Sequence, residues 1–411
     1  MGPGIIVALT WLGAGDLIDS AVAGGSYGYS LMWAMVIALF VRFIFVSIVA
    51  KYQLCNQHGE SVIAGFKRLH PWIPIFVGIV AVFFGHFYCS YMVKGIGEAS
   101  LKLTGFGEPW LWSVLWVTVA AMLIFRGTYK RLEVIFYIFL IMLSTSLIGV
   151  ALWNGFDPIA ATKGAFLFSI PEQSGSFSAL LIITSLIGAV GGSIANLLYP
   201  YFIQQKGWKG PKFRKLQLYD LAFGTFILVG INLSVWTIGA ELLYPRGINI
   251  ESLDDLAKLL TITLGKLGGP IFYLGVFAAM YSSIIGLAVG FGYLVTDTVH
   301  IVQSKKIHQA AKIEVNNSSI YHAVAAWCLF SPLIWTLPNM PGFISLAIIV
   351  NAATVIVLPI LCGSLWYITS SKAYIGVEHK NQWWENTVLA FLFILSIWGS
   401  YEAFIAITNA I

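Results

Sequence analysis

Two carboxylates follow a glycine cluster near the start of the chain, within an apolar stretch. Asp16 directly follows Gly13-Ala14-Gly15, and Asp19 lies one helical turn further on. Residues three positions apart share a face of a helix, so both carboxylates can point the same way. A carboxylate inside a membrane is costly and usually serves a function. The alternative for each acid is structural, such as a hydrogen bond to a neighbouring helix or, for Asp19, a place near a water-filled mouth.

A second glycine cluster interrupts a later apolar segment, which reads Gly188-Ala189-Val190-Gly191-Gly192-Ser193. Backbone groups released from a helix inside a bilayer persist only where they line a cavity or hold a ligand. Freed carbonyl oxygens near Gly13 and Ala189, together with the Asp16 carboxylate, are hard ligands that suit a divalent cation. We therefore predict a metal site at Asp16, Gly13 and Ala189. The alternative is close helix packing, because the cluster also has small-xxx-small glycine spacing.

Other polar positions are predicted to line the same site. Gly192 and Ser193 belong to the second break, and Asn351 falls early in the tenth apolar segment. The predicted substrate-binding set is completed by Gly13, Asp16, Asp19 and Ala189. Asn232, in the seventh segment, is predicted to bond to a neighbouring helix, with a cavity-lining role as the alternative.

Two more ionisable residues lie inside apolar segments. His86 is a candidate proton relay together with Asp19, and the alternative is a packing histidine held by hydrogen bonds. Arg42 lies about two helical turns above Lys51, where it can snorkel inward or pair with an acid. We assign Arg42 no part in the chemistry.

The composition is that of a polytopic membrane protein. Of 411 residues, 58% are hydrophobic and 10% charged, and the mean hydropathy is +0.84. The net charge of +5 follows the distribution of Lys and Arg in short loops, so we expect no nucleic acid partner. The four cysteines lack Cys-x-x-Cys spacing, and motifs for nucleotide binding or hydrolysis are missing. We predict neither an enzyme nor a bound cofactor.

About eleven apolar stretches are long enough to span a bilayer. They are 4–24, 28–50, 73–97, 109–126, 133–153, 178–203, 219–243, 268–297, 319–337, 343–369 and 386–409. The asymmetry of Lys and Arg between alternate loops predicts a cytoplasmic N-terminus and an external C-terminus, in the plasma (inner) membrane. Residues 250–265 carry leucines at helical spacing with acids between them, which predicts an amphipathic helix on the outer face.

The order of these spans predicts two related halves within a single transmembrane domain, 1–411. Spans one to five form repeat one, about 4–153, spans six to ten form repeat two, about 178–369, and one extra helix follows at about 386–409. Because five is odd, the second half must be inserted upside down relative to the first. A glycine break then opens each half, which is the plan of an inverted-repeat transporter.

Several stretches are similar to one known family. The strongest runs from Gly2-Pro3-Gly4 through 23–33, Ala-Gly-Gly-Ser-Tyr-Gly-Tyr-Ser-Leu-Met-Trp, to Ala50-Lys51. Supporting stretches are Gly127 with Arg131-Leu132-Glu133, the segment 278–286, and Asn351 eight residues before Pro359. Over essentially its whole length the chain resembles the natural resistance-associated macrophage protein (Nramp) family of divalent metal transporters. The resemblance implies an all-α membrane fold of the leucine transporter type, with helices 1 and 6 broken.

The metal-binding motifs of that family are altered here. The family breaks its first helix at Asp-Pro-Gly-Asn, whereas here Gly13 takes the aspartate position and Asp16 the asparagine position. The family's sixth helix carries Met-Pro-His, replaced here by Gly192, Ser193 and Ile194. Loss of the thioether favours a hard ion such as Mg²⁺ or Mn²⁺, or a larger solute, over a soft metal.

Proton coupling is also predicted to differ from that of the family. The acidic pair on the family's third helix falls at Cys89 and Met92, which do not act as carboxylates do at neutral pH. We expect coupling to be absent or rerouted through Asp19 or His86.

The leading prediction is an Nramp-like secondary transporter of a divalent metal cation that works by alternating access. The alternative is a carrier of a small organic solute in an enlarged site, and a third reading is a membrane sensor or scaffold without transport. The expected partners are the metal ion or solute and the lipid bilayer. The sequence leaves the oligomeric state open.

Overall fold

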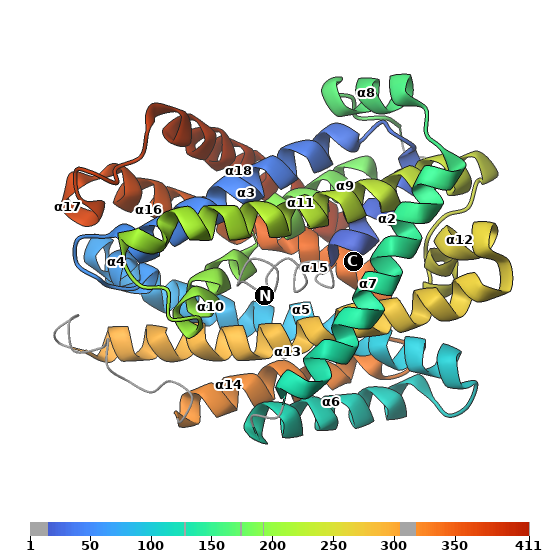
Figure 1. The fold of residues 1–411 in the computed structure, drawn as a ribbon, viewed down its shortest axis with the longest axis horizontal. Helices are drawn as coiled ribbons and strands as arrows, with labels where there is room; N and C mark the ends of the chain where they lie inside the picture. The colour runs from blue at the N-terminus through green and yellow to red at the C-terminus, as the bar shows by residue number, and fades with distance from the viewer. Residues whose placement is uncertain (1–14, 127–128, 173–174, 192, 305–317, 411) are drawn as a thin grey trace.

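The chain is all-helical. The computed structural model describes residues 15–126, 129–172, 175–191, 193–304 and 318–410, and these residues form helices and turns without any strand (Figure 1). The helices before the second glycine cluster are α2 (Leu17–Tyr27), α3 (Met32–Cys55), α4 (Val62–Leu69), α5 (Trp72–Thr104), α6 (Pro109–Arg126), α7 (Tyr129–Asn154), α8 (Pro158–Phe166) and α9 (Ala179–Leu186). Those after it are α10 (Tyr199–Gln205), α11 (Arg214–Ile238), α12 (Leu253–Leu264), α13 (Gly268–Gln303), α14 (Ser319–Phe330), α15 (Phe343–Thr354), α16 (Leu358–Ser370), α17 (Lys372–Ile375) and α18 (Trp383–Ala410). Four short helical turns matter below: η2 (Ile187–Gly191), η3 (Ile194–Leu198), η5 (Gly239–Leu243) and η10 (Ser331–Thr336).

The helix pattern agrees broadly with the predicted spans. In the described part of the chain, eight helical runs are long and apolar enough to cross a membrane, or nine if α7 and α8, bent by 116°, form one span. Every predicted span from 28–50 onward contains a helix, but 319–337 is divided between the short α14 and η10. The first predicted span, 4–24, begins outside the described residues, and α2 forms its second part.

The glycine-broken segments lie inside the bundle. The long helices α5 and α13 pack along each other, and α6 and α14 cover their outer side (Figure 1). Toward the interior, α2 packs on α11 and η5, while α15 packs on both α9 and α5. The start of α2 and the turn η2 after α9 therefore lie in the interior of the bundle.

Glycines allow α2 to approach α11 and η5 closely. A Cβ added at Gly24 would lie 2.5 Å from the carbonyl oxygen of Trp236, and one added at Gly239 would lie 2.9 Å from the backbone nitrogen of Gly25. Contacts this short involve backbone atoms, which cannot turn away as a side chain can. Small residues at helix crossings in membranes permit this kind of packing, and here they fix the position of α2.

The predicted interruption of the later segment is confirmed. Helix α9 ends at Leu186, the wide turn η2 follows, and Ser193 adopts φ −54° and ψ 138° before the narrow turn η3 begins. In the first segment, Gly15 has φ +114°, a conformation that favours glycine, immediately before Asp16. Gly13 and Gly192 lie outside the described residues, so their predicted roles stay predictions.

The predicted amphipathic helix at 250–265 is confirmed as α12. Ser252 and Asp255 form a reciprocal capping box at its N-terminus. Leu253, Leu256 and Leu260 are buried, and α12 packs against α13 and α7. Its apolar face is therefore covered by protein.

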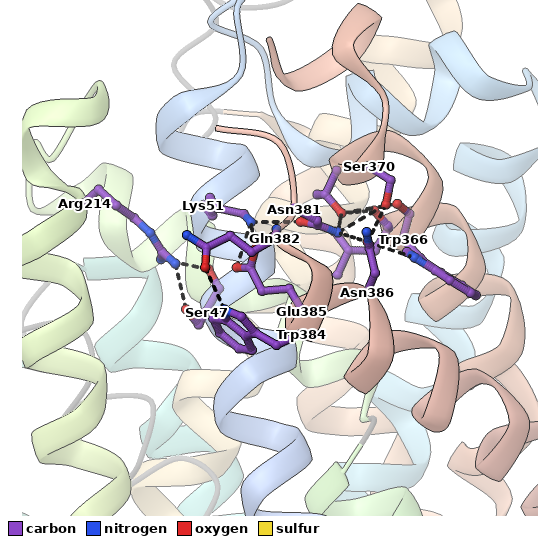
Figure 2. A network of polar contacts seen from close by, with 12 residues as sticks. Ser47, Lys51, Arg214, Trp366, Ser370, Asn381, Gln382, Trp384, Glu385 and Asn386 are labelled. Carbon is purple, nitrogen blue, oxygen red and sulfur yellow. Dashed lines mark hydrogen bonds and ion pairs between the residues drawn. The ribbon is translucent and has the colours of Figure 1, made fainter. Parts of the chain in front are cut away.

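A buried polar network ties one end of α3 to the last helix (Figure 2). The Lys51 Nζ donates to the two carboxylate oxygens of Glu385 at 2.8 and 2.7 Å and to Asn381 Oδ1 at 2.8 Å. Asn381 in turn donates to side chains of α16. On the other side of α3, Arg214 of α11 donates to the carbonyl oxygen of Ser47 at 2.9 Å and to its hydroxyl at 2.8 Å. Four helices are joined at this end of the bundle.

Candidate functional site

Asp16 forms an ion pair with Arg42 in the interior of the bundle. Arg42 Nη1 lies 2.5 Å from Asp16 Oδ2, and Nη2 lies 3.0 Å from Oδ1. Both side chains are 0% exposed. The two parallel contacts are the bidentate geometry in which guanidinium and carboxylate interact most strongly.

The same guanidinium also contacts the second break. Arg42 Nη2 donates to the carbonyl oxygen of Ala189, which belongs to the wide turn η2. A carboxylate from one broken segment and a carbonyl oxygen from the other therefore converge on one positive charge. Asp16 and Ala189 are brought together as predicted, although a side chain of the protein lies between their oxygens.

Arg42 pairs with an acid, which is one of the two alternatives that the sequence offered, but its contact with Ala189 was not predicted. It extends from the middle of α3, which packs directly on η2. The available signal was the arginine itself, because a charge in an apolar span needs a partner. Sequence spacing did not indicate which of the two acids in the first segment it would choose.

Asp19 lies one turn further along α2 and is also fully buried. Its carboxylate accepts hydrogen bonds from Ser185 Oγ at 2.8 Å and from Asn351 Nδ2 at 3.1 Å. Within the ranges that the structure describes, no Lys, Arg or His forms an ion pair with it. Asp19 thus joins α2 to both α9 and α15 by neutral donors.

Asn351 stands between the two broken segments. A Cβ at Gly15 would lie 2.2 Å from Asn351 Nδ2, and a Cβ at Gly188 would lie 2.1 Å from the carbonyl oxygen of Asn351. The side-chain oxygen Oδ1 has no hydrogen-bond partner among the described residues, and neither has the hydroxyl of Tyr91 on α5. An unpartnered polar atom is costly in a buried site, so this region is suited to bind a donor or a cation.

Two further predicted residues contact this region. Asn232 Nδ2 lies 3.4 Å from Asp16 Oδ2, as expected for a bond between neighbouring helices. Ser193, directly after the second break, shares a hydrogen bond of 2.5 Å with the hydroxyl of Tyr88 on α5. Tyr88 was not singled out in the sequence, because a tyrosine in an apolar helix carries no distinctive signal.

Comparison with known proteins identifies the family. The family model described as "Natural resistance-associated macrophage protein-like" matches residues 4–406. The chain belongs to the Nramp family. A curated relative, the divalent metal cation transporter MntH of Bacillus subtilis (strain 168), is 24% identical over 299 residues, which cover 69% of this chain and 67% of that protein. The MntH of Erwinia tasmaniensis is also 24% identical, over 302 residues that cover 71% of this chain and 70% of that protein.

Solved structures show the same fold. The manganese transporter of Eremococcus coleocola aligns with a TM-score of 0.78 at 15% identity, covering 99% of this chain and 86% of that chain. More distant matches are Mhp1, a nucleobase-cation-symport-1 family transporter (TM-score 0.55, 13% identity, 99% and 90% covered), and MhsT in complex with L-phenylalanine (0.55, 16%, 98% and 98%). The all-α transporter fold predicted from the sequence is confirmed. This Nramp protein is an integral membrane transporter, not an enzyme.

His86 lies away from the acids of this Nramp site. Its Nε2 accepts a hydrogen bond from Trp335 Nε1 at 2.8 Å, and its Nδ1 lies 2.7 Å from Ser331 Oγ. Because the Ser331 hydroxyl donates to the carbonyl oxygen of Trp327 at 2.6 Å, Nδ1 must be the donor toward it. Both nitrogens are satisfied in the neutral ring, which is the arrangement of a packing histidine. The structure does not bring His86 together with Asp19.

Among the described residues, the groups near Asp16 that could bind a metal ion are oxygen atoms, and they include no cluster of acids. Cys89 and Met92, at the positions of the family's acidic pair, are fully buried. In the described ranges no group of three or more His, Cys, Asp or Glu is placed to hold a metal ion. The available ligands are the Asp16 carboxylate, the Ala189 carbonyl and the amide oxygen of Asn351, which together form a hard and sparsely charged set.

Proposed function

We propose that this chain moves a divalent metal cation across the plasma (inner) membrane by alternating access. The observation that carries the proposal is the convergence of the Asp16 carboxylate and the Ala189 carbonyl oxygen on one cationic group. Three oxygens, two from Asp16 and one from Ala189, point at one positive charge in the middle of the bundle. The names of the relatives, which include divalent metal cation and manganese transporters, favour a metal over a small organic solute.

The ion is a hard one, Mg²⁺ or Mn²⁺, in this proposal. Carboxylate, carbonyl and amide oxygens suit such ions, whereas thioether and thiolate ligands suit softer metals. The methionine of the family motif is absent from the sequence, where Gly192 stands instead. The buried thiol of Cys89 lies on α5.

Transport is uncoupled from protons in this proposal. The third-helix positions Cys89 and Met92 carry no carboxylate, and the hydrogen bonds of His86 suit a neutral ring. Of the predicted proton pathway, Asp19 alone lies beside the site.

The proposed orientation has the N-terminus in the cytoplasm. The excess of Lys and Arg in alternate loops supports it. In that orientation the network of Lys51, Glu385 and Arg214 lies at the cytoplasmic end of the bundle (Figure 2). Residues of about 4–153 and 178–369 are proposed to be inverted repeats, each opened by a broken helix.

The test is uptake of Mg²⁺, Mn²⁺ and Ca²⁺ into liposomes that contain the purified chain. Wild type is expected to take up at least one of these ions, and Asp16→Asn to lose that uptake. Asp254→Asn is the matched control, because Asp254 pairs with Lys102 at the surface, where both are about half exposed. Since Asp16→Asn leaves Arg42 unpaired, the double variant Asp16→Asn/Arg42→Gln provides a charge-balanced second test, also expected to be inactive. The proposal fails if wild type moves none of the three ions, or if uptake survives in both Asp16 variants.

A further inference from the structure

We propose that Arg42 is a tethered cation that occupies the substrate's binding site in the metal-free carrier, so that the metal must displace it. This inference rests on the proposed function and deepens it. It assigns a role to a residue that the sequence prediction left without one.

The guanidinium of Arg42 and the metal need the same oxygens. Arg42 engages both carboxylate oxygens of Asp16 and the carbonyl oxygen of Ala189. A hard divalent ion would bind these oxygens at roughly 2.0–2.6 Å, inside the space that the guanidinium nitrogens fill. Two positive groups also repel each other strongly in a buried, poorly screened site. Arg42 and the metal are therefore mutually exclusive occupants.

Arg42 also has an effect in the metal-free carrier, where it remains paired with Asp16. A fully buried ion pair is weak evidence for stability, because desolvation of the two charges offsets much of their attraction. The pair does join α3 to both broken segments, so its state depends on how those segments are arranged. In the metal-free carrier the guanidinium supplies the positive charge that Asp16 requires. A proton is then unnecessary for the return of the carrier.

The structure also offers a place for the displaced guanidinium. Asp19 lies one turn along α2 from Asp16 and is fully buried, and its carboxylate forms no ion pair among the described residues. Beside it, Asn351 Oδ1 has no partner among the described residues and is buried. Asp19 and Asn351 thus offer a carboxylate and a free acceptor to a guanidinium that turns away from Asp16. A displaced charge that finds acceptors avoids the cost of an unpaired buried ion.

Arg42 is therefore expected to exchange its oxygen partners when the metal binds. Without metal, Arg42 pairs with Asp16 and Ala189. With metal, the ion takes these oxygens and Arg42 moves toward Asp19 and Asn351. Metal affinity in wild type is lowered by the fraction of molecules in which Arg42 fills the site, since only the remainder is competent to bind.

The experiment measures binding of Mn²⁺ and Mg²⁺ to the purified chain by calorimetry. Arg42→Gln is expected to bind Mn²⁺ tighter than wild type by about tenfold or more, because the competitor is removed. Arg68→Gln is the matched control, because Arg68 pairs with Glu60 elsewhere in the chain, and it should behave as wild type.

A second variant separates competition from a structural role. In Arg42→Ala, added methylguanidinium chloride is expected to weaken Mn²⁺ binding competitively, while wild type and Arg68→Gln should not respond. If Arg42→Gln does not yield folded protein, Arg42→Lys keeps the charge but loses the two-pronged contact, and it should bind Mn²⁺ more tightly than wild type.

The outcomes separate this inference from the proposed function. Equal or weaker Mn²⁺ binding in the Arg42 variants than in wild type, without competition by methylguanidinium, would overturn the inference and leave metal transport standing. If neither wild type nor any Arg42 variant binds a metal ion while remaining folded, the inference and the proposed function are both wrong.

Discussion

Gly188 provides the sharpest structural test of how the two broken segments meet. In Gly188→Ala, the new Cβ would lie 2.1 Å from the carbonyl oxygen of Asn351, 2.6 Å from Thr354 Oγ1 and 3.0 Å from Val355 Cγ2. Ordinary contact begins near 3.4 Å, so η2 and α15 must separate by about 1 Å, because the nearest atom belongs to the backbone. Overpacking of this kind costs about 1–3 kcal/mol.

The expected consequences of Gly188→Ala are lower stability and weaker transport. A loss of about 1–3 kcal/mol corresponds to a fall in Tm of roughly 1–4 °C for a chain of 411 residues, because the entropy of unfolding grows with chain length. Separation of η2 from α15 also moves the Ala189 carbonyl relative to Asp16, so metal uptake should fall with it. The assay is thermal unfolding of the purified protein followed by size-exclusion chromatography, together with liposome uptake.

Gly230→Ala is the matched control for this substitution. Gly230 lies within α11, and a Cβ there meets nothing within 4 Å. Alanine is favoured over glycine in a helix by about 1 kcal/mol, so this variant should melt at or slightly above the wild-type temperature. An unchanged Tm and uptake in Gly188→Ala would refute the close approach of η2 to α15.

Two other predictions concern the ends and the side of the bundle. Lys51→Met should destabilise the protein by about 3–5 kcal/mol, because it leaves Glu385 buried without its cation, and Lys51→Met/Glu385→Leu should recover most of that loss. If Lys51→Met is as stable as wild type in thermal unfolding, leaving Glu385 without its cation does not carry this cost. His86→Gln should leave the dependence of metal uptake on pH unchanged, because glutamine can also donate to Ser331 and accept from Trp335. A pH profile that shifts in this variant would restore His86 as a proton relay.

Much of the architecture was predictable from the sequence because it depends on local pattern. Long apolar runs indicate spans, and glycine clusters within them indicate breaks, as η2 and η3 confirm. Helix α12 was predictable from leucine spacing. The short α14 and the turn η10 were not anticipated as separate elements, because the apolar run at 319–337 carries no break other than a single proline.

The approach of Asp16 to Ala189 was predictable from the sequence, but the Arg42 side chain that contacts both of them was not. Asp16 and Ala189 were chosen because each offers oxygen at a break, and the fold brings them together. The partner of Asp16 depends on which face of α3 turns toward η2, and that is decided by tertiary packing. Asp19 offered the same chemistry to Arg42 only one turn away, so spacing alone left the choice between two acids open.

The carbonyl oxygen of Ala189 belongs to the backbone, so a substitution of the side chain does not remove it. Every residue placed at position 189 brings the same carbonyl, so replacing the side chain leaves this half of the site chemically intact. A scan of side-chain substitutions would remove the carboxylate of Asp16 but would leave the carbonyl oxygen of Ala189 in η2 in place. Only a change in the main chain itself, such as an ester in place of the following amide, would weaken this oxygen and report on its contribution.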